Sequence, residues 1–154
     1  MTTGIANTIE KQIQLRQPRS KVWRALTDSR EFGQWFGVAF KDPFRLGARV
    51  QGKITHKGYE HMTMDITIER MEPERVFAWR WHPGASKPGE DFSSEPTTLV
   101  TFELKDVEGG TLLTVVESGF DQIPLERRAR AYRDNDGGWA RQMKAIRGHL
   151  ARSA

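Results

Sequence analysis

The stretch YRDNDGGWARQMKAIRGHL, residues 132–150, decides how this chain folds. Its large apolar residues recur at intervals of three, four and seven, the spacing of one face of an α-helix: Tyr132, Trp139, Met143, Ile146 and Leu150. The pattern predicts a long C-terminal helix whose apolar face must be buried against another element. Gly137 and Gly138 fall inside this helix, where each glycine costs about 1 kcal/mol against alanine. We therefore expect a kink, a late helix start or a close backbone contact at the pair.

Most segments before this helix alternate apolar and polar residues, as strands with one buried face do, whereas residues 112–116 form a continuous apolar-rich run that is typical of a strand but leaves its facing ambiguous. The expected strands cover residues 9–15, 50–54, 62–68, 77–81, 100–105 and 112–116. Between the first two strands we expect two short helices, one opened by Pro18 and one capped by Asp28 and ended by Gly37. Residues 82–96 are rich in Gly, Pro and Ser and show no period, which predicts a long loop.

Two further connections follow from the same patterns. A loop is expected through Phe40 and Phe44. The turn before the strand at 62–68 is expected to be the three residues His56-Lys57-Gly58, with Gly58 left-handed, because this length puts both apolar rows on one face. Together the elements predict an α+β helix-grip fold. One curved antiparallel sheet wraps around the long C-terminal helix, with two short helices after the first strand.

Composition sets the class of protein. The 154 residues, 37% of them hydrophobic and 29% charged, are expected to form one domain, residues 1–154. The sequence has no cysteine, which excludes disulfides and thiolate nucleophiles. Its start lacks the apolar region of a signal peptide, and no apolar run approaches the ~20 residues of a membrane-spanning helix. We therefore expect a cytoplasmic protein.

Five strings of the sequence carry a family resemblance: VWRALTDSREFGQWF (22–36), FAWRW (77–81), TLVTFEL (98–104), GGTLLTVVESGF (109–120) and GGW (137–139). From Ile9 to Leu150 the chain resembles the activator of heat-shock-protein-ninety ATPase homologue family, in the START-like, Bet-v-one-like helix-grip (SRPBCC) superfamily. The resemblance implies a hydrophobic cavity between sheet and C-terminal helix, faced by Leu113, Val115 and Glu117. Members of the superfamily bind lipids, sterols, polyketides or plant hormones, and some are cyclases.

We accordingly expect the protein to bind a small hydrophobic or amphipathic ligand, lipid-like or polyketide-like, in this cavity. Two alternatives remain open: a co-chaperone-like protein-interaction module with a closed core, and a cyclase or hydrolase that uses a cavity carboxylate. The candidate lining residues are Trp35, Phe36, Phe40, Phe44, Met62, Met64, Trp79, Trp81, Phe102, Val115, Glu117, Phe120, Trp139 and Met143. Glu117 is the first candidate for orienting a ligand; the alternative is a rim carboxylate satisfied by backbone, Arg80 or His82.

Other chemistry finds little support in the sequence. The four histidines are scattered without metal-ligand spacing, so we assign no metal, no cofactor and no catalytic residue. The basic cluster Arg127, Arg128, Arg130 and Arg133 is interpreted as a solvated helix face, with an acidic partner as the alternative. It is not interleaved with stacking aromatic rings beyond Tyr132, so a nucleic-acid partner is not expected. The edge strands leave pairing into a homodimer open.

Overall fold

The structure is a computed structural model that describes residues 7–84 and 87–152. Its elements in chain order are β1 (Thr8–Leu15), α1 (Arg19–Thr27), α2 (Ser29–Phe36), β2 (Val38–Phe40), β3 (Arg49–Ile54), β4 (Thr63–Glu72), β5 (Val76–Trp81), β6 (Thr98–Val107), β7 (Gly110–Ser118), the short 3₁₀ helix η1 (Phe120–Gln122) and α3 (Leu125–Arg152). All seven strands form one antiparallel sheet, in the order β1-β7-β6-β5-β4-β3-β2. This is the α+β helix-grip architecture that the sequence predicted.

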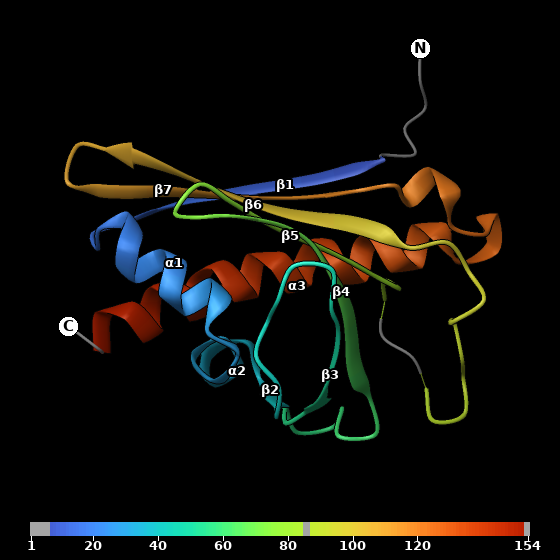
Figure 1. Ribbon diagram of the computed structural model, residues 1–154. Coiled ribbons are helices and arrows are strands. Elements are labelled where there is room, and N and C mark those ends of the chain that lie inside the picture. Colours follow the sequence, from blue (N-terminus) through green and yellow to red (C-terminus); the bar gives the residue numbers. More distant parts are fainter. Residues whose placement is uncertain (1–6, 85–86, 153–154) are drawn as a thin grey trace, which may run out of the picture.

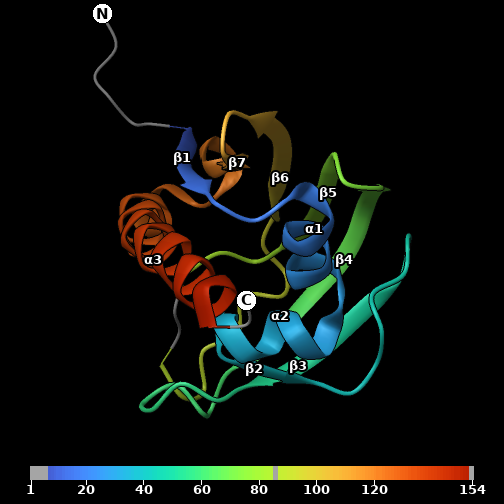
Figure 2. The same cartoon turned by 90° about the vertical axis from the view of Figure 1, so that its left-hand side faces the viewer.

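The sheet curves around an interior that α3 closes. Figure 1 shows α3 running lengthwise along the sheet, and Figure 2 shows the strands arching from β1 over to β3 with α3 across the opening. Helices α1 and α2 fill the side of the arch near the end of α3. Since both the concave face and the helix stripe are apolar, their burial against each other holds the layers together.

Alternation along the strands decides which side chains reach this interior. Along β7 the buried residues are Thr111, Leu113, Val115 and Glu117, while the residues between them are half-buried. The pairing of β6 with β7 sets Val100 opposite Glu117. Leu113, Val115 and Glu117 therefore point to the interior, where they are fully buried rather than facing the open cavity that the family resemblance implied.

The two short helices begin and end as predicted. The Asp28 side chain accepts hydrogen bonds from the backbone N–H groups of Arg30 (3.1 Å) and Glu31 (3.0 Å), which caps α2. Gly37 ends α2 in the left-handed region, with φ 93°. The Asp28 cap and the Gly37 terminus fix the ends of α2, so Phe36 is its last residue and lies next to the site described below.

Two sequence predictions were wrong in detail. The residues expected as a loop through Phe40 include the three-residue strand β2, which is too short to show a period. The β3–β4 connection spans residues 55–62 rather than three residues, because two successive turns, Tyr59 N–H to His56 O and Met62 N–H to Tyr59 O, lengthen it. Gly58 is left-handed as expected, with φ 95°. The longer connection shifts the β3–β4 pairing by two residues from the expected register, so that Gly52 lies opposite Met64. A shift of two residues still keeps the apolar rows on one face of the sheet.

Gly33 offers a test of how closely α2 packs on β2. A Cβ at Gly33 would lie 2.1 Å from the carbonyl oxygen of Val38, far inside van der Waals contact. Alanine normally stabilises a helix interior by about 1 kcal/mol over glycine, but here we expect Gly33→Ala to destabilise the protein by about 2 kcal/mol through overpacking. Urea unfolding of the variant measures this directly. A variant at least as stable as the natural protein would contradict the close α2–β2 contact.

Candidate functional site

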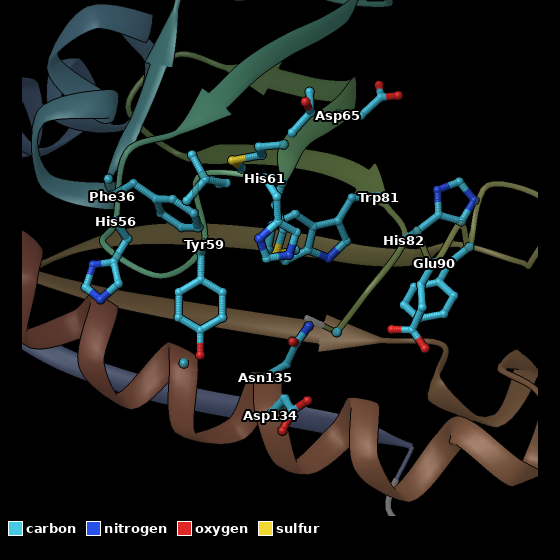
Figure 3. A pocket seen from close by; sticks show the side chains of 18 of the residues that line it. Phe36, His56, Tyr59, His61, Asp65, Trp81, His82, Glu90, Asp134 and Asn135 are labelled. Carbon is cyan, nitrogen blue, oxygen red and sulfur yellow. The ribbon is translucent and has the colours of Figure 1, made fainter. Parts of the chain in front are cut away.

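An open groove with a volume of about 880 Å³ lies between α3, the β3–β4 end of the sheet and the segment that links β5 to β6 (Figure 3). Its apolar wall is formed by Phe36, Ile54, Met62, Met64 and Trp81. Polar side chains surround this wall, from the 55–62 loop on one side and residues 90–93 on the other. The groove is therefore amphipathic.

On the α3 side the groove is bounded by Gly137 and Gly138, which carry no side chains to fill it. Helix α3 is continuous across the pair, so a late helix start is wrong. A close backbone contact is also wrong, because the heavy atoms near a Cβ at either position belong to the Arg141 guanidinium. The two glycines widen the groove at a cost in helix stability.

Directly behind this groove lies Glu117, a carboxylate with 0% exposure. Its Oε2 accepts from Trp81 Nε1 (2.8 Å) and Thr98 Oγ1 (2.6 Å), and its Oε1 accepts from Trp139 Nε1 (2.8 Å). The Asn135 side-chain amide donates to both oxygens, at 2.9 and 3.1 Å. An ionised carboxylate only accepts, so it matches a set that includes two indole N–H groups and an amide. Four donors from β5, β6 and α3 thus converge on one side chain of β7.

This arrangement corrects the sequence-based alternative for Glu117. It is not a rim carboxylate satisfied by Arg80 or His82: Arg80 pairs with Glu69, and the His82 ring bonds the Glu95 carbonyl oxygen. Among residues 7–84 and 87–152 no cation forms an ion pair with Glu117. Trp81 and Asn135, by contrast, line the groove and donate hydrogen bonds to Glu117, which lies behind them. The carboxylate therefore positions the groove wall without being part of it.

The structure divides the predicted lining residues into two groups. Phe36, Met62, Met64 and Trp81 line the groove. The others lie outside its lining, mostly buried in the core: Trp35, Phe40, Phe44, Trp79, Phe102, Val115, Glu117, Phe120, Trp139 and Met143. Trp79 shows why, because its ring lies 5.3 to 6.4 Å from those of Phe32, Phe36, Phe77, Phe102, Trp81 and Trp139. Rings fill the space between sheet and helix, and the hollow lies at its open end.

The segment between β5 and β6 is held against α3 by Arg127. This guanidinium donates to Glu95 Oε1 (2.9 Å) and to the Pro83 carbonyl oxygen (2.9 Å), and it lies 3.7 Å from the centroid of the Phe92 ring. Arg127 is 8% exposed, so the interpretation of the basic cluster as a solvated helix face is wrong for this residue. Phe92 lines the groove, which means that Arg127 fixes that wall.

Carboxylates gather at the same end of the groove. The Arg49 side chain, which donates to Asp65 at 2.6 and 2.9 Å, lowers the pKa of that carboxyl, although partial burial opposes the effect. The pKa of Asp91 is lowered by the backbone N–H of Ser93. Both groups line the groove and are negative at neutral pH. Within the described parts of the chain no three potential ligands cluster as a metal site would require, and none of the helices there could cross a membrane.

The hydrogen bonds to Glu117 predict a large cost for a small change. Glu117→Gln replaces one oxygen by an NH₂ group, which then faces at least one indole N–H with no acceptor between them. We expect a loss of about 2–3 kcal/mol, the range for a buried donor that loses a charged acceptor. Urea unfolding measures it, with the exposed Glu103→Gln on β6 as the matched control, expected within ~0.5 kcal/mol of the natural protein. Equal stability of the two variants would contradict the network.

Substitution within the glycine pair is expected to raise the stability of the protein, whereas substitution of Glu117 is expected to lower it. A Cβ at Gly137 would lie in ordinary contact, 3.5 Å from Arg141 Nη1. Gly137→Ala is therefore expected to stabilise α3 by about 1 kcal/mol while narrowing the groove. Thermal unfolding checks this against Gly148→Ala, a change on the same helix outside the groove. A destabilised Gly137→Ala beside a stabilised Gly148→Ala would show that Gly137 serves packing rather than space.

Comparison with known proteins places this geometry in a family. The family model described as Activator of Hsp90 ATPase homolog 1-like protein matches residues 16–151. A search of curated proteins found no match. Among solved structures, protein MLL2253 from Mesorhizobium loti is 23% identical, with a TM-score of 0.75 over 96% of this chain and 98% of its own.

Two further structures share the fold. DynU16, from the dynemicin biosynthetic locus, is 23% identical with a TM-score of 0.71; the match covers 95% of this chain but 48% of that one. The Aha1 dimer from Colwellia psychrerythraea is 17% identical with a TM-score of 0.66, over 92% of this chain and 94% of its own. At these identities the structures show the fold. The match over residues 16–151 shows that the chain belongs to the Activator of Hsp90 ATPase homolog 1-like family.

Proposed function

We propose that the protein binds a small amphipathic molecule in the groove between α3 and the β3–β4 end of the sheet. The observation that carries this proposal is the groove itself: about 880 Å³, with an apolar wall, a polar rim and two glycines where α3 would otherwise fill it. Ligand sites span roughly 300–1,000 Å³ and combine apolar walls with a few polar groups.

The wall suits a flat or flexible apolar body. Trp81 and Phe36 present half-buried rings 6.4 Å apart, and Met62 and Met64 add adaptable thioether chains beside them. Because Trp81 is hydrogen-bonded to Glu117, its ring is oriented before a ligand arrives, and this reduces the ordering cost of binding.

The same contacts favour binding over catalysis by Glu117. A general base needs an oxygen within reach of the substrate, whereas Glu117 is fully buried and accepts five hydrogen bonds. The cyclase or hydrolase alternative that relied on this carboxylate therefore loses its support. A closed-core interaction module fits the packed rings but leaves the open groove without a role.

Native mass spectrometry of the freshly purified protein is the first test. We expect an added mass that disappears on denaturation. The same spectrum reports whether two copies associate, a pairing for which the dimeric Colwellia relative provides a precedent.

A groove-filling variant tests the location of binding. Gly138→Leu places a side chain in the groove, and we expect it to weaken binding of the neutral fluorescent probe N-phenyl-1-naphthylamine at least tenfold. Gly148→Leu adds the same side chain to α3 outside the groove and is expected to bind as the natural protein does. Probe binding that is equal in both variants, or absent from the natural protein, would overturn the proposal.

A further inference from the structure

We infer that the groove selects an anion: an amphipathic molecule whose apolar body lies along Trp81 and Phe36, and whose carboxylate or phosphate head is bound by Arg141 near the 55–62 loop. The inference rests on the proposed function and names the chemical class of the ligand.

Arg141 is the cation that marks this end. Its Nη1 and Nη2 lie 3.5 and 3.9 Å from where Cβ atoms would stand at Gly137 and Gly138, so the guanidinium folds back along the helix beside the groove. In the described part of the chain it has neither an ion pair nor a hydrogen bond, unlike Arg49, which pairs with Asp65, and Arg127, which pairs with Glu95. Its donors, in the fork geometry that matches a carboxylate or phosphate, are available.

Across the groove from Arg141, the 55–62 loop contributes two ring side chains to the same end of the groove. Figure 3 shows His56 and Tyr59 extending from the 55–62 loop toward α3, over the part of the helix that follows Asn135. Their ring centroids lie 6.0 Å apart, and within the described residues the Tyr59 hydroxyl has no hydrogen-bond partner. The Arg141 guanidinium lies beside Gly137 and Gly138, which follow Asn135 by two and three residues, about 3–5 Å along the helix in the same direction. The guanidinium, the phenol and an imidazole thus line one end of the groove.

The far end has the opposite charge. Asp65, Glu90 and Asp91 line it, and Figure 3 shows Asp65 and Glu90 away from His56 and Tyr59. Asp65 is paired with Arg49, whereas Glu90 has Arg130 at 4.0 Å. Arg133 and Asp134 also line the groove, and their opposite formal charges sum to zero. Because Asp65 and Glu90 are ion-paired with arginines, Asp91 leaves this end with a net negative charge. An anionic head is repelled there and attracted to Arg141, so one orientation is favoured.

Four probes with the same ten-carbon chain test the inference by isothermal titration calorimetry below their micelle concentrations: decanoate, decyl phosphate, decanol and decyltrimethylammonium. We expect decanoate or decyl phosphate to bind about tenfold more tightly than decanol, and the stronger of the two identifies the head group. Arg141→Ala should remove this advantage and leave decanol unchanged, while Arg141→Lys keeps part of it. Arg147→Ala, which removes the same charge from α3 outside the groove, should change nothing. The advantage should shrink as salt rises.

Three outcomes would overturn the inference while leaving binding in the groove intact. Decanol could match decanoate, Arg141→Ala and Arg147→Ala could behave alike, or decyltrimethylammonium could bind best. Failure of the proposed function looks different: none of the four probes binds, and Gly138→Leu does not affect N-phenyl-1-naphthylamine.

Discussion

One buried carboxylate determines how this fold is closed. Desolvating a charge without a counter-ion is costly, and the cost is tolerable when every lone pair receives a donor. Glu117 meets that condition with donors from β5, β6 and α3, so these three elements must all be in place before the side chain is satisfied. The interaction therefore specifies how α3 lies on the sheet, in addition to the apolar burial that drives the two together. A correctly placed α3 in turn forms one side of the groove.

The location of the groove follows from how the interior is filled. Phe32, Trp79 and Trp139 belong to a continuous set of ring contacts between 4.7 and 6.4 Å, so little space is left between the sheet and the middle of the helix. Toward the β3–β4 end the sheet departs from α3 (Figure 2), and there the 55–62 loop and residues 90–93 form the walls instead. Packed rings and an open groove thus coexist beneath one sheet, each next to a different part of it.

The sequence predicted most of the elements because their signals are local. Alternation, or for residues 112–116 a continuous apolar run, identified six strands, Asp28 and Gly37 bounded α2, and the stripe from Tyr132 to Leu150 located α3. Strand β2 and the length of the 55–62 loop were missed, since three residues carry no period and consecutive turns leave no distinct pattern. The partners of Glu117 were missed for another reason: Trp81, Thr98 and Asn135 reach it through strand register and helix placement, which no local spacing encodes. The glycine pair stood out in the sequence without indicating a groove, whereas Phe36, Met62, Met64 and Trp81 were predicted as lining residues and do line it.

The same pair gives α3 an uneven local stability. Before it, Arg127 ties the helix to Pro83 and Glu95; after it, Met143, Ile146 and Leu150 are buried in the core. Gly137 and Gly138 add no side-chain packing of their own, and the residues on either side of them, Asn135 and Trp139, are held by hydrogen bonds to Glu117. Hydrogen exchange of the amides in this part of α3 should therefore depend on that carboxylate. A molecule bound beside Gly137 and Gly138 would stabilise the closed helix by mass action and so slow the hydrogen exchange of the amides around them. The exchange rate in α3 would then measure whether the groove is occupied.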